Sequence, residues 1–173
     1  MKLIEGMKQI KALTQKAEDL RKKIGQYSAD MDFETPTYGT ADEQRETVRG
    51  WIQSHSDILK ETLRLRVAIQ RTNLASSVSI TLGDKVVTKT IAEWIHRRRD
   101  LATLEMESWK ALTDRNIKES ATIQTTAGTA RDVKIRRYYT PAERDKNMEL
   151  YRSEPLTIDA TLEVVNAVTD LME

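Results

Sequence analysis

The sequence contains no cysteine, which excludes disulfide bonds and thiolate metal sites and is typical of proteins from a reducing compartment. Its six glycines are scattered, so they form no glycine-rich phosphate loop, and no Gly-x-Ser-x-Gly nucleophile motif is present. These absences predict a protein without catalytic, cofactor-binding or metal-binding residues, and we expect it not to be an enzyme.

Long apolar runs are also missing from the chain. No stretch approaches the length of a membrane span, and Glu5, Lys8 and Lys11 interrupt the first residues, so we expect no membrane contact and no secretory signal. The 28 basic and 27 acidic residues nearly cancel, which gives no general attraction to nucleic acid or lipid. We therefore expect a cytoplasmic protein, or a virion protein if a phage encodes it.

Apolar residues at the start of the chain follow a heptad repeat. Leu3, Ile10, Ala17 and Ile24 stand seven residues apart, and each is followed three positions later by Gly6, Leu13, Leu20 or Tyr27. This pattern predicts a helix over residues 1–30 that packs on other helices with a coiled-coil-like crossing. Its glycine weakens the first turn unless a neighbouring segment approaches closely there. We expect the seam to serve an oligomer through the following residues: Leu3, Ile10, Leu13, Leu20 and Ile24.

The next segments predict the fold class. Residues 31–40 have the composition of a loop, and apolar residues recur at helical spacing over residues 42–75, so two long helices form an antiparallel hairpin. Alternating residues around the Gly83-Asp84 turn predict a short β-hairpin over residues 77–88. We therefore expect a mainly α protein of one domain, 1–173, built on a long helical hairpin or bundle with one or two β-hairpin insertions.

The second half of the chain predicts further helices and an arm. Thr90 and Glu93 form a capping box, which starts a third helix over residues 90–116. Residues 121–139 are β-prone around Gly128 and predict an extended hairpin or arm. Residues 141–173 predict two helices separated by Pro155. The last helix is acidic and the first is net basic, so we expect the two to meet within or between chains.

Short phrases distributed over most of the chain carry a family resemblance. They are Arg71-Thr72-Asn73 at the end of the second helix, Arg99-Asp100-Leu101 in the third, and the basic and aromatic pair Arg137-Tyr138 before the final helices. Together with the long amphipathic first helix, they resemble the septicolysin-like family of uncharacterised bacterial proteins; the loop around Asp32 to Gly39 is not part of the resemblance. The resemblance implies a helical fold, is compatible with an oligomer, and offers no catalytic residues to carry across.

Two clusters invite a functional interpretation. Glu93 and His96 have the Glu-x-x-His spacing of ferritin-like metal sites, but no second motif exists, since Ile52 precedes His55 by three residues. We therefore expect ordinary surface pairs there. The run Arg97-Arg98-Arg99 points in three directions on a helix, so it cannot line one surface.

The expected arm carries the other candidate contacts. In a strand, Lys134, Arg136 and Tyr138 share one face and Arg137 lies on the other. Cations beside aromatic rings suit nucleic acid, whereas a two-faced hairpin equally suits an arm between subunits, which we favour. The sequence thus predicts a non-enzymatic structural or interaction protein that self-assembles by helix packing, such as a component of a phage or other large particle. The alternative is a nucleic-acid-binding module that uses this strand and the basic face of the first helix.

Overall fold

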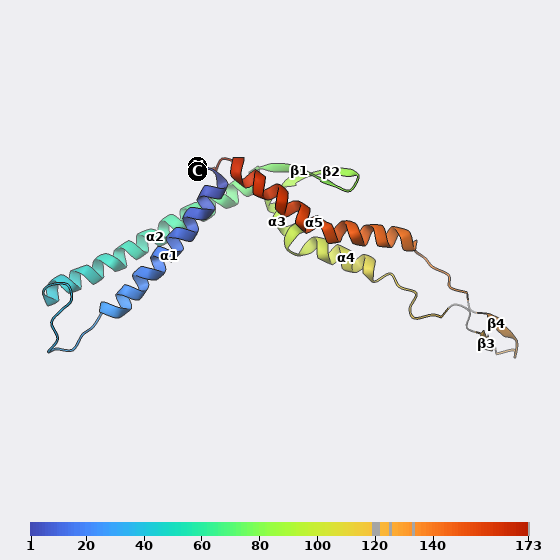
Figure 1. Cartoon of the computed structure of the whole chain (residues 1–173), viewed down its shortest axis with the longest axis horizontal. Coiled ribbons are helices and arrows are strands. Elements are labelled where there is room, and N and C mark those ends of the chain that lie inside the picture. The colour runs from blue at the N-terminus through green and yellow to red at the C-terminus, as the bar shows by residue number, and fades with distance from the viewer. Residues whose placement is uncertain (119–121, 125, 133, 173) are drawn as a thin grey trace. The chain divides into compact units, whose positions relative to one another are not determined.

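The computed structural model describes residues 1–118, 122–124, 126–132 and 134–172, and it confirms a mainly α-helical chain with short antiparallel β-hairpins (Figure 1). None of the described helices is long and apolar enough to cross a membrane. The elements in chain order are α1 (Leu3–Tyr27), α2 (Ala41–Ala75), β1 (Ser77–Leu82), β2 (Lys85–Thr90), α3 (Ile91–His96), a π-helical turn η1 (Arg97–Leu101), α4 (Ala102–Lys110), β3 (Thr122–Gln124), β4 (Ala130–Asp132) and α5 (Pro141–Val168).

The chain divides into two compact units, and the single domain over residues 1–173 stays a prediction. Unit 1 comprises Met1–Ser77 and Glu163–Glu173, and unit 2 comprises Val78–Leu162. The chain length gave only a prior for the domain count. The long first hairpin packs mainly within itself, and the later elements form their own set of contacts, so each unit has its own buried residues.

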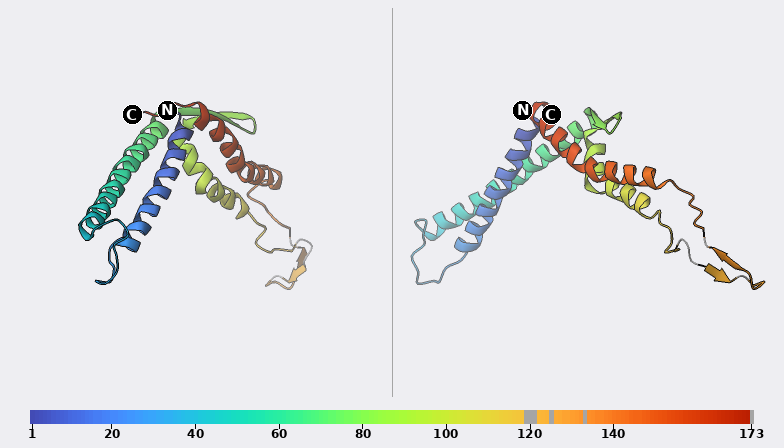
Figure 2. Two further views of the ribbon diagram at one scale, coloured as in Figure 1. Left: turned by 60° about the vertical axis from the view of Figure 1, so that its left-hand side comes forward. Right: turned by 45° about the vertical axis from the view of Figure 1, so that its right-hand side comes forward.

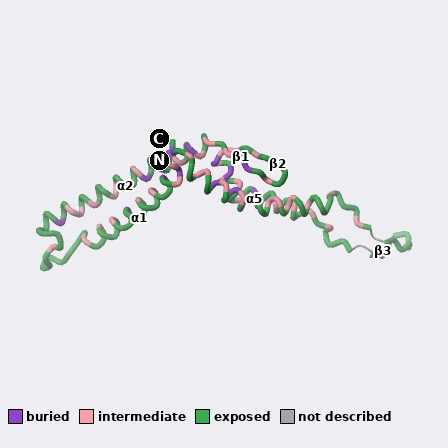
Figure 3. Tube along the Cα trace, turned by 45° about the horizontal axis from the view of Figure 1, so that its top comes forward, coloured by how far each residue is buried: buried purple, intermediate pink, exposed green. Residues whose placement is uncertain are grey.

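Unit 1 is built on the predicted antiparallel helical hairpin. α1 and α2 run side by side in the views of Figures 1 and 2. A capping box starts α2, since the backbone N–H of Glu43 donates to the Thr40 hydroxyl and the Glu43 carboxylate accepts from the backbone N–H of Thr40. Half-buried and exposed segments alternate along both helices (Figure 3), as expected of two helices that cover each other on one side only.

The open end of this hairpin is closed by the last residues of the chain. The backbone N–H of Leu3 donates to Thr169, and that of Leu171 donates to Met1, so Lys2 and Asp170 form an antiparallel bridge. Their side chains add a salt bridge of 2.9 Å. The two ends of the chain therefore meet at this point, just before α1 and just after α5, while the packing of the first helix on the last stays a prediction. Leu171 also explains Gly6, because a Cβ there would lie 3.3 Å from the Leu171 side chain.

Unit 2 begins with the predicted β1–β2 hairpin, which turns at Gly83 with a φ of +59°. The capping box at Thr90 starts α3 as predicted, and the buried Trp94 donates from its indole nitrogen to the Val78 carbonyl at 2.9 Å. The predicted helix over residues 90–116 is shorter. It contains the π-helical turn η1 and ends at Lys110, ahead of the left-handed backbone of Arg115 and Asn116.

The C-terminal part differs from its predicted structure. Residues 141–168 form one helix, α5, with Pro155 inside it, instead of two helices. Proline removes one backbone donor and costs about 3 kcal/mol in a helix interior. The buried side chains of Glu154 and Ile158 stand on both sides of the proline, and their packing outweighs the local preference for a break.

The arm is confirmed as a hairpin, but its second strand is displaced. β3 pairs with β4 in the register Thr122 to Asp132, across a turn in which Gly128 has a φ of +75°. Residues 134–137, predicted as strand, have irregular backbone, while position 133 lies outside the described residues. The cause is Asp114, which binds the side chains of Arg137 and Tyr139 and holds this segment beside the end of α4.

Candidate functional site

An apolar stripe lies exposed along α2 in unit 1. Its members stand 7, 4, 4 and 7 residues apart, which places them on one side of the helix. Their exposed fractions lie between 36% and 67%, although they are leucine, isoleucine or valine. The side that faces away from the stripe holds the buried residues of α2, such as Ile58 and Leu65. The stripe consists of Ile52, Leu59, Leu63, Val67 and Leu74.

Residues of this stripe line two hollows of the surface. One of 190 Å³ lies between α1 and α2 at Ala17, Leu59 and Leu63, and one of 360 Å³ continues along α2 at Leu63 and Val67. A third, of 280 Å³, lies at the end of the hairpin, where Val48 of α2 approaches the end of α1. We call the stripe together with these hollows the α2 groove.

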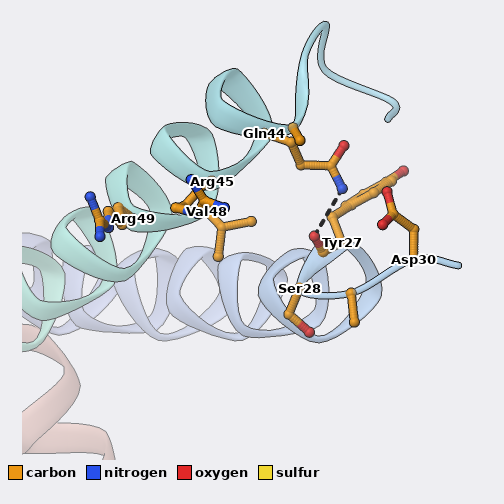
Figure 4. Close-up of a pocket in the computed structure, with 9 residues that line it drawn as sticks. Tyr27, Ser28, Asp30, Gln44, Arg45, Val48 and Arg49 are labelled. Atoms are coloured by element: carbon orange, nitrogen blue, oxygen red, sulfur yellow. Dashed lines mark hydrogen bonds between the residues drawn. The ribbon is translucent and has the colours of Figure 1, made fainter. Parts of the chain in front are cut away.

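The end of the α2 groove is shaped by aromatic packing. Figure 4 shows Gln44 of α2 pointing to the end of α1, where its amide donates to the Tyr27 carbonyl at 3.1 Å. The rings of Tyr27, Tyr38 and Trp51 meet with centroids 5.2–5.8 Å apart. The backbone N–H of Tyr38 donates to Gln44, which ties the connecting loop to α2. These contacts hold the connecting loop and the end of α1 against α2, and so fix one end of the α2 groove.

The charges that line the α2 groove are almost all basic. Four of the six basic residues that line it form i,i+3 salt bridges with acidic residues of α2. The other two, Arg66 and Arg71, make no salt bridge within the described part of the chain. Asp30, in the hollow at the hairpin end, is the acidic residue among the linings. The basic side chains that line the hollows are Arg45, Arg49, Lys60, Arg64, Arg66 and Arg71.

The predicted oligomer seam of α1 lies elsewhere. Leu3 is buried, and Ile10, Leu13, Leu20 and Ile24 are half-buried on the side where α1 packs against α2. The heptad pattern thus serves first to close the hairpin within one chain. The sequence carried a signal for the α2 groove as well, because α2 has more apolar residues than one face of a helix can hold.

Unit 2 holds a second cavity, of about 510 Å³, between the β1–β2 hairpin, the turn η1 and α5. Arg97 of η1 binds the carboxylate of Glu154 through two hydrogen bonds of 2.7 and 2.6 Å, and Glu154 is only 1% exposed. Glu105 forms a further salt bridge of 2.5 Å, and Tyr151 lies under the guanidinium, 5.8 Å from ring centroid to Cζ. Hydrogen bonding to Glu154 raises the pKa of Arg97, so the guanidinium keeps its positive charge.

The arrangement of Arg97 is structural in character. Nε and one Nη are occupied by Glu154 and the other Nη by Glu105, so its charge is compensated from both sides. A π-helical turn often marks a functional position, and here it aims Arg97 at α5. The sequence showed only three consecutive arginines. The sequence predicted that the three arginines point in different directions. It could not predict that Arg97 binds the buried Glu154.

The candidate contact residues of the arm differ in their surroundings. Lys134 and Arg136 are exposed, and Tyr138 is 90% exposed. Arg137 binds Asp114 with bonds of 2.8 and 2.7 Å, and this hydrogen bonding holds the pKa of Asp114 below its ordinary value. Since the segment is not a strand, the predicted division into two faces does not apply to it.

The Glu-x-x-His pair has local roles. Glu93 accepts hydrogen bonds from the backbone and hydroxyl of Thr90, and these bonds lower its pKa. His96 contacts Arg99 at 3.2 Å. Within the described ranges, no group of three or more histidine, aspartate or glutamate side chains is placed to hold a metal ion.

Comparison with known proteins gives no neighbour for this arrangement. No protein-family model matches the chain, and no curated protein or solved structure is significantly similar to it. The resemblance to the septicolysin-like family stays a prediction. The functional argument therefore depends on the surfaces described above.

Proposed function

We propose that the protein is a non-enzymatic structural protein that assembles with copies of itself through helix packing. The exposed apolar stripe of the α2 groove is the observation that carries this proposal. Soluble proteins tolerate scattered apolar residues on their surfaces, but a contiguous stripe along a helix is typical of an interaction surface. A component of a phage or other large particle is a specific version of this function.

The size of the stripe is sufficient to contribute to association. Full burial of a leucine, isoleucine or valine side chain stabilises by about 1.5–3 kcal/mol, and these five are about half exposed, so completing their burial contributes roughly 4–7 kcal/mol. The partner surface adds its own buried area. Together they reach the range of about 4–15 kcal/mol that association costs in translational and rotational freedom.

A pair of matched variants tests the proposal. Leu63→Gln places a polar group in the centre of the α2 groove, and we expect it to weaken self-association about tenfold, measured by sedimentation velocity over a range of concentrations. Leu104→Gln alters a leucine of comparable exposure on α4 and serves as the control. Equal effects of the two variants, or no effect of Leu63→Gln, would contradict a role for the groove.

A second candidate function is nucleic-acid binding through the arm. The observation that favours it is Tyr138, a residue that is 90% exposed two positions after the exposed Arg136, since exposed aromatic rings near cations stack on bases. Binding of a labelled single-stranded oligonucleotide, followed by fluorescence anisotropy, would fall steeply with salt and would be lost in Lys134→Ala/Arg136→Ala. Absence of binding at low salt would remove this candidate.

A further inference from the structure

The α2 groove has the chemistry of a site for an acidic helix. Its floor is apolar, and the hollow at Leu63 and Val67 is lined by Lys60, Arg64 and Arg71 with no acidic residue among its lining. A segment that fits it must present apolar side chains at helical spacing together with carboxylates at their border.

A second copy of α2 does not meet this requirement. Antiparallel pairing that matches the two stripes places Leu63 opposite Leu63 and Leu59 opposite Val67, so opposed residue numbers sum to 126. The same register brings Lys60 of one copy near Arg66 of the other, so like charges approach each other. Parallel pairing brings each arginine beside its own copy. Both arrangements oppose cation to cation, which disfavours α2 as its own partner.

The final segment of unit 1 does meet it. Val164 and Val168 are 64% and 62% exposed, and Met172 is also exposed, at spacings of four residues. Glu163 beside them is exposed and makes no salt bridge among the described residues. The sequence from Ser153 to Glu173 has no basic residue, and Glu154, Asp159 and Asp170 are already paired within the chain with Arg97, Arg98 and Lys2, so Glu163 is the carboxylate that this segment offers to a partner. α5 ends at Val168, so its exposed helical part from Val164 to Val168 covers about 6 Å at about 1.5 Å per residue, which matches the about 6 Å from Leu63 to Val67, while Met172 lies beyond the helix.

We infer that the α2 groove binds the segment Glu163–Met172 of a second copy, with Val164 and Val168 on the apolar floor and Glu163 beside Arg71. This inference deepens the proposed self-assembly and depends on it. Each copy then presents one groove and one acidic segment, so contact is made between two different surfaces. The basic lining of the groove selects the end of the chain that carries no basic residue.

Charge reversal tests this contact. Arg71→Glu places a carboxylate where Glu163 of the other copy is expected, and we expect self-association to weaken about tenfold or more, measured by sedimentation velocity. Glu163→Lys should weaken it similarly. The double variant Arg71→Glu/Glu163→Lys reverses both charges in every copy and should restore association. Arg49→Glu, which makes the same charge change at the other end of the groove, is the control and should not be rescued by Glu163→Lys.

The outcomes separate the two proposals. Loss of association in both single variants and recovery in the double variant would support the contact. If the unaltered protein associates but Arg71→Glu leaves association unchanged, or the double variant fails to recover, this contact is wrong while self-assembly stands. If the unaltered protein does not associate at all, both proposals fall. Circular dichroism at 222 nm checks that each variant keeps its helices, and Val168→Gln gives an independent disruption of the same contact.

Discussion

The buried ion pair between Arg97 and Glu154 makes a quantitative prediction about unit 2. Replacing Arg97 by methionine keeps the side chain long and apolar but leaves the Glu154 carboxylate without its bidentate partner, although it is 1% exposed. An uncompensated buried charge costs about 3–5 kcal/mol. We therefore expect Arg97→Met to lower the free energy of unfolding of unit 2 by that amount.

Replacing Glu154 should lower the free energy of unfolding by a different amount. Glu154→Leu leaves Arg97 with Glu105, which is about half exposed, so its charge is still partly compensated and the loss should be smaller. Replacing both partners by apolar residues of similar size is often neutral or stabilising, because neither charge must then be desolvated. The double variant Arg97→Met/Glu154→Leu should thus be more stable than Arg97→Met by about 2–4 kcal/mol.

Urea unfolding followed by tryptophan fluorescence measures these effects. In a Trp51→Phe background the remaining tryptophans, Trp94 and Trp109, both belong to unit 2 and report on its unfolding. Arg152→Met breaks an exposed pair with Glu149 on the same helix and should cost less than about 1 kcal/mol. The reasoning is refuted if Arg97→Met costs no more than Arg152→Met, or if the two changes at the buried pair are additive.

Two further predictions concern a carboxylate and a glycine. Hydrogen bonding from Arg137, with a second bond from Tyr139, keeps the pKa of Asp114 low in the folded state, so this contact stabilises above the unfolded pKa of about 3.9 and is lost as the pH falls through the folded value. A titration of its carboxyl carbon by NMR should show a low pKa that rises in Arg137→Met, and an unchanged value in that variant would contradict the assignment. Gly50→Ala should stabilise α2 by about 0.5–1 kcal/mol, because a Cβ there meets nothing within 4 Å, and urea unfolding reported by Trp51 should shift to higher denaturant. A shift to lower denaturant would contradict the open environment of that position.

Much of the fold could be predicted because local signals agree with the final packing. The heptads of α1, the capping box at Thr90 and the turn at Gly83 each specify an element by short-range chemistry, and each is found. The predictions are wrong where a contact with a residue distant in the sequence determines the local structure. Glu154 and Ile158 keep α5 continuous through Pro155, and Asp114 binds Arg137 in a segment that is not a strand. No pattern within a few residues of the affected segment reports such a contact.

The α2 groove could be predicted from the sequence only in part. The sequence showed that α2 has apolar residues at many positions, but periodicity alone does not separate those that pack on α1 from those that stay exposed. The structure separates Ile58 and Leu65, which are buried, from Leu59 and Leu63, which are not. The groove and its basic border follow from that separation, because the arginines stand on the exposed side.

The mass of the unaltered protein in solution tests the central claim most directly. Light scattering on a sizing column, over a wide range of protein and salt concentrations, should give a mass above the 19.8 kDa of one chain that reaches a stable multiple as concentration rises. A mass of one chain under every condition would contradict self-assembly through the α2 groove.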